Sequence, residues 1–366
     1  MKKTRIIGTL CVAAVWLALT LGAWLDPAEE ISVSERRKLA QLPSVSVKTV
    51  LDGRFMKDFE SYTLDQFPLR DAFRQLKASV HYDLFGQKDN NGIYLADGSA
   101  AKLEYPLNED SISHAVKKFD AIYRKYLEGT GSSVAVTVVP DKGYYLAEAN
   151  GYPAMDYEKL FALVREGTSW AQFVDITDLL STESYYATDT HWRQEQIVNV
   201  AQRLCEALGT TVPKAENYTA EEVEQPFYGV YSGQAAIPMD ADIMYLLRSP
   251  ILDGCTVYNH ETGKTTPIYD LEKLGGWDLY EVYLSGAAAL LTIENPQGDP
   301  DRELIVFRDS FGSSIVPLLL DGYSTVTVVD IRYLSSELLG NFVDFHGQDV
   351  LFLYSTLVLN SSSTIK

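Results

Sequence analysis

The chain has 366 residues, of which 46% are hydrophobic and 22% charged, a composition typical of globular proteins. This composition excludes a collagen-like fibre, a low-complexity disordered chain and a small scaffold held by disulfides. Lysine and arginine total 31 against 50 aspartate and glutamate, so the formal net charge is -19. Such a charge argues against a nucleic-acid partner held through phosphate contacts.

The N-terminus combines a cationic start with a long apolar run. Lys2, Lys3 and Arg5 precede the segment from Ile6 to Leu25, which carries no charged side chain. About 20 apolar residues cross a bilayer as a helix. The run ends in bulky residues such as Trp24, where signal peptidase requires small ones. Residues 1–25 therefore predict an uncleaved signal anchor in preference to a cleaved signal peptide.

This anchor predicts a single-pass cell-membrane protein. Cations before the span keep the first residues in the cytoplasm and place the rest outside, and cleavage of the segment would instead give a secreted protein. Residues 26–50 are rich in charged side chains and predict a stalk. Outside the span, Cys205 and Cys255 are either paired or both free, and neither has a neighbour at metal-ligand spacing. We therefore expect no metal.

Helices and strands alternate along residues 51–366, with an irregular, hairpin-containing insert at about 218–295. The helices are expected at 52–84 with a break at Pro68, and at 110–127, 157–166, 191–208, 313–320 and 335–342. The strands are expected at 93–96, 133–140, 173–176, 304–307, 326–329 and 350–354. This alternation predicts an α/β layer sandwich around a mostly parallel sheet.

The first chemical motif is Thr188-Asp189-Thr190-His191-Trp192, at a predicted loop-to-helix junction. A carboxylate two residues from an imidazole can orient the ring, fix its tautomer and stabilise the imidazolium. The structural alternative is that Asp189 or Thr190 caps the following helix and that Trp192 begins its packed face. Taken alone, this motif favours the capping interpretation.

The second motif is Arg308-Asp309-Ser310-Phe311-Gly312, between a predicted strand and a predicted helix. The carboxyl ends of parallel strands are where α/β sheets place their sites, and a helix N-terminus can receive an oxyanion. Aspartate and serine are also ordinary capping residues at such a turn. A nucleophilic serine needs a base, and the chain has five histidines, so the two motifs together favour an Asp-His-Ser site.

At these residues the chain resembles the DHHW proteins, relatives of the alginate O-acetyltransferases AlgX and AlgJ in the SGNH hydrolase-like superfamily. The resemblance covers most of the chain after the span. Its matching segments are Phe59-Glu60-Ser61-Tyr62, Asp65-Gln66-Phe67-Pro68-Leu69-Arg70-Asp71, Val139-Pro140-Asp141-Lys142, the two motifs above and Asp330-Ile331-Arg332. It implies a three-layer α/β/α sandwich in permuted order, since ordinary SGNH esterases place the serine first.

The resemblance also assigns catalytic roles. Asp189 is the orienting carboxylate, His191 the base and Ser310 the nucleophile, which attacks an acetyl donor, becomes acetylated and passes the acetyl group to a sugar hydroxyl. No cofactor is required. The implied partners are an extracellular polysaccharide and a membrane-bound O-acyltransferase that supplies the acetyl groups.

Further site residues are expected around this triad. The oxyanion donors are expected at Gly286 and Phe311, although Ala287 stands where many relatives carry a donating asparagine. The candidate contacts to the glycan are Lys142, Trp192, Tyr231 and Arg332, for each of which ordinary packing or surface charge is the competing explanation.

Two other functions remain open from the sequence. An extracellular carbohydrate esterase of the same fold would share the triad and use water as the acceptor. A non-catalytic glycan-binding or assembly component would keep the fold, and Ala287 is the residue that favours it.

Overall fold

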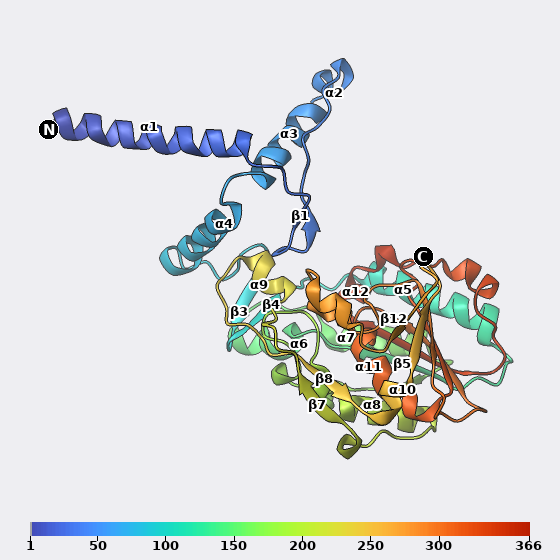
Figure 1. Cartoon of the computed structure of the whole chain (residues 1–366). Coiled ribbons are helices and arrows are strands. Elements are labelled where there is room, and N and C mark those ends of the chain that lie inside the picture. The colour runs from blue at the N-terminus through green and yellow to red at the C-terminus, as the bar shows by residue number, and fades with distance from the viewer. Residues whose placement is uncertain (1) are drawn as a thin grey trace. The chain divides into compact units, whose positions relative to one another are not determined.

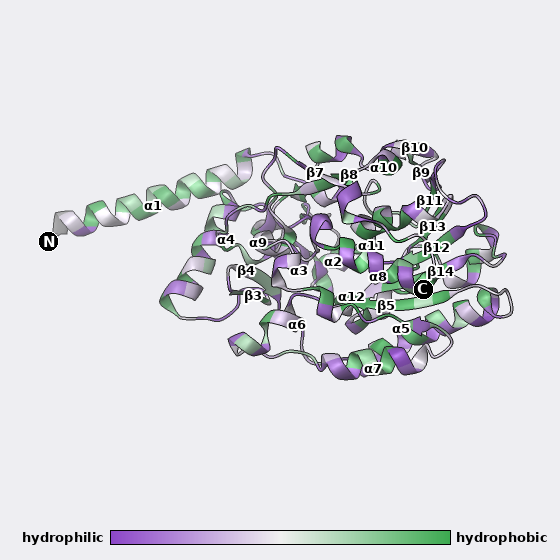
Figure 2. Cartoon of the chain, turned by 90° about the horizontal axis from the view of Figure 1, so that it is seen from below, coloured by the Kyte–Doolittle hydropathy of each residue, from purple (hydrophilic) through white to green (hydrophobic). Residues whose placement is uncertain are grey.

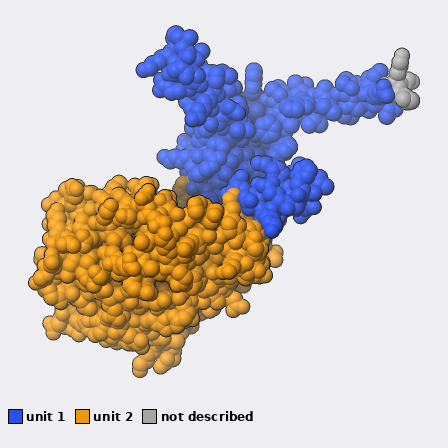
Figure 3. All heavy atoms as spheres, turned by 180° about the vertical axis from the view of Figure 1, so that it is seen from behind, with its two compact units in different colours: residues 1–91, 232–239 blue, residues 92–231, 240–366 orange. Residues whose placement is uncertain are grey.

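The computed structural model describes residues 2–366 and divides into two compact units (Figure 3). The first unit comprises residues 1–91 and 232–239, and the second comprises residues 92–231 and 240–366. Met1 and the side chains of Lys2 and Lys3 lie outside the described part, and with them two of the three cations that precede the apolar run.

The first unit is built mainly from helices (Figure 1). Its elements are α1 (Lys2–Leu25), β1 (Ile31–Ser32), β2 (Arg37–Lys38), α2 (Val47–Leu51), α3 (Arg54–Asp65), α4 (Arg70–Ser79) and a π-helix (Val80–Leu84). The stretch Thr4–Leu25 of α1 is long and apolar enough to cross a membrane, as Figure 2 shows by its largely hydrophobic colouring. By length and composition it fits a single-pass anchor or a signal sequence.

The predicted stalk packs against the helices that follow it. Asp65, at the end of α3, accepts two hydrogen bonds from the Arg37 guanidinium at 2.8 and 2.5 Å and one from the Ala40 amide at 2.8 Å. The break between α3 and α4 lies at Pro68, as expected, because proline lacks the amide hydrogen that a continuing helix needs. Residues 51–91 thus belong with the stalk in the first unit.

The second unit contains an eight-stranded sheet in the order β10-β9-β11-β13-β12-β14-β5-β6. The sheet strands are β5 (Val134–Val139), β6 (Gln172–Phe173), β9 (Thr256–Asn259), β10 (Lys264–Pro267), β11 (Leu290–Glu294), β12 (Glu303–Arg308), β13 (Thr325–Val329) and β14 (Asp349–Ser355). The five strands from β13 to β6 run parallel, whereas β10, β9 and β11 add an antiparallel edge. The predicted insert supplies this edge, including the hairpin of β9 and β10.

Helices cover both faces of the sheet, so the unit has three layers. The remaining elements are β3 (Ile93–Ala96), β4 (Ser99–Lys102), α5 (Glu109–Ile122), α6 (Gly143–Leu146), α7 (Tyr157–Gly167), α8 (Val198–Leu208), β7 (Thr219–Glu222), β8 (Tyr245–Arg248), α10 (Pro250–Gly254), α11 (Gly312–Ile315) and α12 (Thr356–Asn360). The chain passes from one unit to the other within α9 (Val230–Ala235).

Alternate residues of the central strands fill two separate cores. On β5, Ala135 and Val139 pack with α8, whereas Val136 and Val138 pack with α5 and α7. Successive strand residues point to opposite faces, so a strand covered on both faces must be apolar at nearly every position. This explains the unbroken apolar runs in the sequence and confirms the predicted α/β architecture.

Several predicted elements differ in the structure. The helix expected at 313–320 is α-helical only over Gly312–Ile315 and continues as a 3₁₀-helix, Val316–Gly322, and the strand expected at 173–176 forms only at Gln172–Phe173. The helix expected at 191–208 begins only at Val198, because residues 191–197 form an extended loop with a short 3₁₀ turn at Gln194–Gln196. The segment expected as a helix at 335–342 is a 3₁₀-helix, Ser336–Asn341. Cys205 and Cys255 are both buried and both free in the described chain.

Candidate active site

The serine of the second motif follows β12 directly, at the carboxyl end of a strand flanked by two parallel neighbours. Asp309 shapes the turn. Its Oδ1 accepts from the Phe311 amide at 3.0 Å and its Oδ2 accepts from the Ser355 amide, at the end of β14, at 2.7 Å. Both carboxylate oxygens of Asp309 thus accept hydrogen bonds from backbone amides. The Ser310 side chain is half-buried at the edge of the sheet.

Asp189 and His191 lie in a tight loop that is closed at its base. The Tyr186 amide donates to the His191 carbonyl at 3.1 Å, and Tyr185 pairs with Trp192 in an isolated β-bridge. Because no helix begins in this loop, neither Asp189 nor Thr190 caps a helix that follows it, and the predicted capping role is wrong.

The three side chains form one continuous hydrogen-bonded line. Asp189 Oδ1 lies 2.6 Å from His191 Nδ1, and His191 Nε2 lies 2.8 Å from Ser310 Oγ. An ionised carboxylate only accepts, so Nδ1 carries the proton and Nε2 is left to accept from the serine hydroxyl. This is the tautomer that a base for Ser310 requires.

Backbone amides fix the carboxylate of Asp189 in place. Oδ1 also accepts from the His191 amide at 3.0 Å, and Oδ2 accepts from the Val230 amide at 2.8 Å. Gly229 permits this approach, since a Cβ at that position would lie 2.3 Å from the Asp189 Cβ. The Asp189 side chain is fully buried, and that of His191 is 9% exposed.

Aromatic and polar side chains hold the loop against the Ser310 turn. The Tyr280 ring stacks on the His191 ring with centroids 3.8 Å apart and planes at 9°. Trp192 Nε1 donates to the Phe311 carbonyl at 3.1 Å and to Ser314 Oγ at 2.9 Å, and the Tyr280 hydroxyl lies 2.8 Å from the same Ser314 oxygen. These contacts tie together two segments that lie more than a hundred residues apart.

Asp242 holds the two residues that precede Asp189 through hydrogen bonds. Its Oδ1 accepts from the Ala187 amide at 2.8 Å, and its Oδ2 accepts from the amide and the hydroxyl of Thr188 at 2.8 and 2.5 Å. Sequence reasoning missed Asp242, Val230 and Tyr280, because each is separated from the motif by dozens of residues of irregular chain. No local spacing in that chain signals the contact.

The four expected glycan contacts are largely buried. Trp192 is inaccessible, Tyr231 donates from its hydroxyl to Thr190 Oγ1 at 3.0 Å, and Arg332 forms an ion pair with Asp330 at 2.6 Å. Lys142 donates from Nζ to the carbonyls of Tyr186 and Ala187 at 2.8 and 3.0 Å. All four therefore serve internal contacts in this structure.

Burial sets the electrostatics around Lys142. Desolvation lowers the pKa of its ammonium group to about 7, against the opposing attraction of Asp189, Asp242 and Asp141. The neighbouring carboxyl of Asp141 is also buried, and desolvation raises its pKa although Thr356, Gly143 and Tyr157 donate hydrogen bonds to it. Burial thus disfavours the charged form of both Lys142 and Asp141.

The two amides expected to bind an oxyanion both donate inside the protein. The Phe311 amide is bound to Asp309, and the Gly286 amide donates to the Tyr283 carbonyl at 3.1 Å. Gly286 follows Leu284 and Ser285, which have positive φ angles of 54° and 58°. Such left-handed residues cost free energy and cluster at functional sites. The expected pair of donors is thus not available in this conformation.

No family model matches the chain. The probable alginate O-acetylase AlgJ of Pseudomonas syringae pv. tomato is 23% identical over 278 residues, which cover 68% of this chain and 64% of that protein. The chain thus matches less than two thirds of the length of this curated relative. The match agrees with the resemblance to AlgJ noted from the sequence motifs.

Solved structures share the fold. A DHHW family protein of Eubacterium siraeum aligns with a TM-score of 0.60 and 21% identity, covering 76% of this chain and 95% of that one. Bacillus cereus PatB1, solved with a sulfonyl adduct, aligns with a TM-score of 0.60 and 15% identity, covering 73% of this chain and 95% of that one. These likenesses confirm the fold predicted from the sequence.

Proposed function

We propose that this protein is an extracytoplasmic O-acetyltransferase that modifies a cell-surface or secreted polysaccharide through an acetyl-serine intermediate. The observation that carries the proposal is the hydrogen-bonded line from Asp189 through His191 to Ser310. The similarity to AlgJ supports acetyl transfer as the reaction class.

The proposed first half-reaction acetylates the enzyme. His191 Nε2 takes the hydroxyl proton of Ser310 as Oγ attacks the carbonyl carbon of the acetyl donor. Asp189, held by backbone amides, stabilises the imidazolium that forms. The tetrahedral intermediate then collapses, and His191 returns its proton to the leaving group.

The second half-reaction transfers the acetyl group to the acceptor. A sugar hydroxyl occupies the place of the leaving group and loses its proton to His191 while its oxygen attacks the acetyl-Ser310 carbonyl. Collapse of the second intermediate breaks the Ser310 ester and returns the proton to Oγ. The same histidine thus acts alternately as base and acid in both halves.

The Ser310 amide is our candidate for the oxyanion donor. Among the described residues no backbone acceptor takes this amide hydrogen, whereas the amides of Phe311 and Gly312 are bound to Asp309. A donor aimed at the developing charge is worth about 3 kcal/mol in acyl-transfer enzymes. Rearrangement of the strained Leu284–Gly286 turn would free a second amide.

The cellular setting is part of the proposal. Segment α1 acts as an uncleaved anchor and places the second unit outside the membrane. A single span cannot carry acetyl groups across the bilayer, so a membrane-bound O-acyltransferase is the proposed supplier. The resemblance to AlgJ supports a polysaccharide acceptor, and it does not identify the polymer.

A trapping experiment tests the nucleophile. Purified protein is mixed with a chromogenic acetyl ester, quenched in acid and digested, and the acetylated peptide is identified by mass spectrometry. We expect a single acetyl group on Ser310, and an aryl sulfonyl fluoride, suggested by the adduct of PatB1, should block it. A protein that is neither acetylated nor sulfonylated at Ser310 would contradict the enzymatic proposal.

An acceptor experiment separates transfer from hydrolysis. Turnover of the same ester is measured with and without oligosaccharides of different composition, and acetylated sugar is quantified. A transferase produces acetyl-sugar at the expense of free acetate. Production of acetate alone with every acceptor, together with removal of acetyl groups from acetylated glycans, would identify the protein as an esterase instead.

A further inference from the structure

The segment Asp65–Asp71 is part of the resemblance to the DHHW proteins, but it contributes no residue to the line of Asp189, His191 and Ser310. It belongs to the first unit, where it packs against the chain that leaves α1. Gln66 accepts a hydrogen bond from the Glu29 amide at 2.9 Å and donates to the Glu29 carbonyl at 2.9 Å. The segment therefore fastens α3 and α4 to the residues immediately after the span.

A cavity of 420 Å³ lies beside this segment, entirely within the first unit. It is lined by Glu35, Arg37, Leu64, Asp65, Phe67, Arg70, Phe73, Arg74, Lys77, Asn90, Asn91 and Ala236. Four of these side chains are cationic and two are carboxylates, and a third carboxylate just outside the lining, Asp71, pairs with Arg70 and Arg74, which leaves the cluster a formal charge of +1. In a chain of net charge -19, this is an unusual concentration of positive charge.

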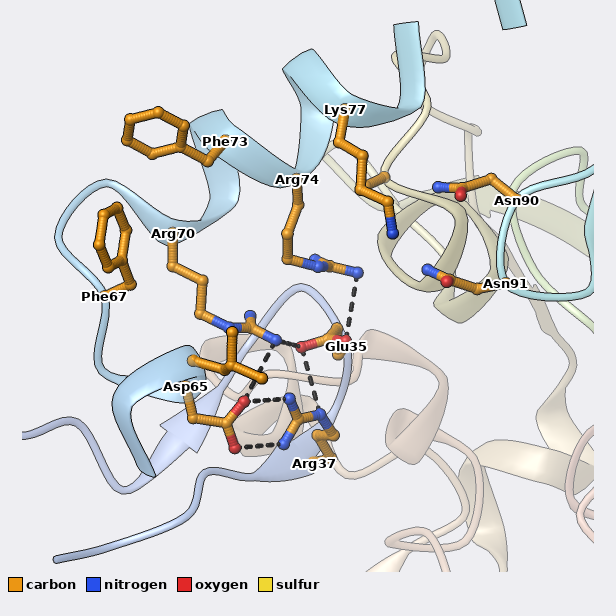
Figure 4. A pocket seen from close by; sticks show the side chains of 12 residues that line it. Glu35, Arg37, Asp65, Phe67, Arg70, Phe73, Arg74, Lys77, Asn90 and Asn91 are labelled. Carbon is orange, nitrogen blue, oxygen red and sulfur yellow. Dashed lines mark hydrogen bonds and ion pairs between the residues drawn. The ribbon is translucent and has the colours of Figure 1, made fainter. Parts of the chain in front are cut away.

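The carboxylates are shared among the arginines. Glu35 forms ion pairs with Arg37, Arg70 and Arg74, and Asp65 binds Arg37 through two hydrogen bonds. These pairs hold the guanidinium groups around one space, as Figure 4 shows.

Lys77 is the cation of the lining that has no acidic partner within the described chain. Figure 4 shows its side chain directed towards the same space as Arg74 and Asn91. The side-chain amides of Asn90 and Asn91 already donate to the carbonyls of Ala235 and Gln234, so Lys77, beside the paired arginines, is the donor best placed to bind a compact anion.

The cavity lies close to the end of the span. Three residues separate Leu25, the last residue of α1, from Glu29, which is bonded to Gln66, and the four Cα-to-Cα steps between them extend at most about 14 Å. At Gly22 an added Cβ would lie 3.1 Å from Pro68. The segment therefore sits at the depth of the lipid headgroups when α1 crosses a bilayer.

Apolar side chains lie on the same elements as the cavity, and Phe67 and Phe73 line it. Phe67 and Phe73 form an edge-to-face pair with centroids 5.3 Å apart, and Leu69 and Leu76 are 72% and 59% exposed. Exposed aromatic and aliphatic side chains next to basic residues are typical of helices that lie in a membrane interface.

We propose that this cavity binds the phosphate of an anionic phospholipid in the outer leaflet, with Lys77 and Arg74 as donors and the apolar rim in the upper acyl region. The inference goes beyond acetyl transfer and rests on only one part of the proposed function, the retention of α1 as an anchor. One cation near a membrane surface strengthens the binding of anionic lipid by about fivefold.

The test measures lipid selectivity of the full-length chain. The protein is reconstituted in nanodiscs of phosphatidylcholine and phosphatidylglycerol, extracted in mild detergent, and its retained lipids are counted by native mass spectrometry. We expect enrichment of phosphatidylglycerol, and a loss of about fivefold in that enrichment for Lys77→Gln. Lys57→Gln, which removes an exposed lysine of α3 outside the cavity, is the matched control and should leave the enrichment unchanged.

Three results would overturn the proposal. The first is equal retention of the two lipids by the wild-type chain, and the second is equal loss in both lysine variants. The third is displacement of phosphatidylglycerol by inorganic phosphate or glucuronate as readily as by glycerol phosphate lipid, which would assign the cavity to a soluble anion. The mass of the intact chain also shows whether α1 is retained. A chain that has lost α1 and still hydrolyses the ester would refute the lipid site, and the proposal of acetyl transfer would be unaffected.

Discussion

The triad and the first-unit cavity hold charged side chains in opposite ways. Asp189 is fully buried, and two backbone amides and one imidazole hold its carboxylate oxygens in place. Glu35, in the cavity, is held by three flexible arginine side chains, of which Arg37 is 40% exposed. Backbone amides are fixed in position, whereas the guanidinium group of an arginine side chain can move and exchange one carboxylate or anion for another. The first arrangement suits a fixed transition state, and the second suits an adaptable binding site.

The largest expected effect tests whether the rigid site is catalytic at all. Ser310→Ala should lower kcat/KM for a chromogenic acetyl ester by about a thousandfold or more, as expected when the nucleophile of a triad is removed. Ser313→Ala, three residues further along, removes the side-chain hydroxyl of a buried serine that touches Ser310 through its backbone amide, which the substitution keeps, and it serves as the control. Comparable activity in the Ser310 and Ser313 variants would rule out Ser310 as the nucleophile.

Substitution of Asp189 and of Asp309 separates two roles, the orientation of the His191 ring and the stabilisation of the backbone turn at Ser310. Asp189→Asn presents an amide to His191 and favours the wrong tautomer, so we expect kcat to fall by about 10²–10⁴ with little change in Tm. Asp309→Asn leaves one of two buried backbone amides unpaired and should cost about 1–3 kcal/mol of stability. Activity assays and thermal unfolding of both variants measure the two effects. An Asp189→Asn protein with full activity would show that another group orients His191.

The stacking of Tyr280 on His191 offers a smaller test of rigidity. Tyr280→Leu removes the flat surface that holds the ring, and we expect kcat to fall by about tenfold with KM unchanged. Tyr280→Phe keeps the ring and loses only the contact to Ser314, so it should restore most of the activity. Steady-state kinetics distinguish the two. Equal losses in the leucine and phenylalanine variants would assign the effect to the hydroxyl network instead of to the stacked ring.

The buried ammonium group of Lys142 predicts a pH-dependent stability. Burial lowers the pKa of Lys142 from 10.5 to about 7, so between these values the unfolded chain binds more protons than the folded one. The stability of the wild type should therefore rise with pH above about 7, by at most about 1.4 kcal/mol per pH unit. Below pH 7 both states are protonated and the dependence ends.

Lys142→Met removes this titration while keeping the buried volume. Thermal unfolding of both proteins at pH 7 and pH 9 measures the difference, and the wild type should gain stability relative to the variant at the higher pH. A constant difference between the two proteins would show that Lys142 does not carry a lowered pKa.

Most strands of the second unit could be predicted because each one is marked by a short local run of apolar residues. The runs that became β5, β12, β13 and β14 are apolar at nearly every position, which is what burial on both faces of a parallel sheet requires. Prediction failed for the helix expected from His191. The polar and aromatic residues 191–197 make their contacts with distant segments, and those contacts outweigh local helix propensity.

By itself, the sequence determined the alternation of helices and strands, the apolar span and the identity of an aspartate, a histidine and a serine that could act together. Only the tertiary structure decided that the three side chains meet, that no helix directly follows Asp189 for it to cap, and that the expected glycan contacts are buried. Residue types and short spacings record chemistry and local propensity. Contacts such as that of Tyr280 with His191 depend on how the irregular insert packs, and no short sequence pattern encodes that packing.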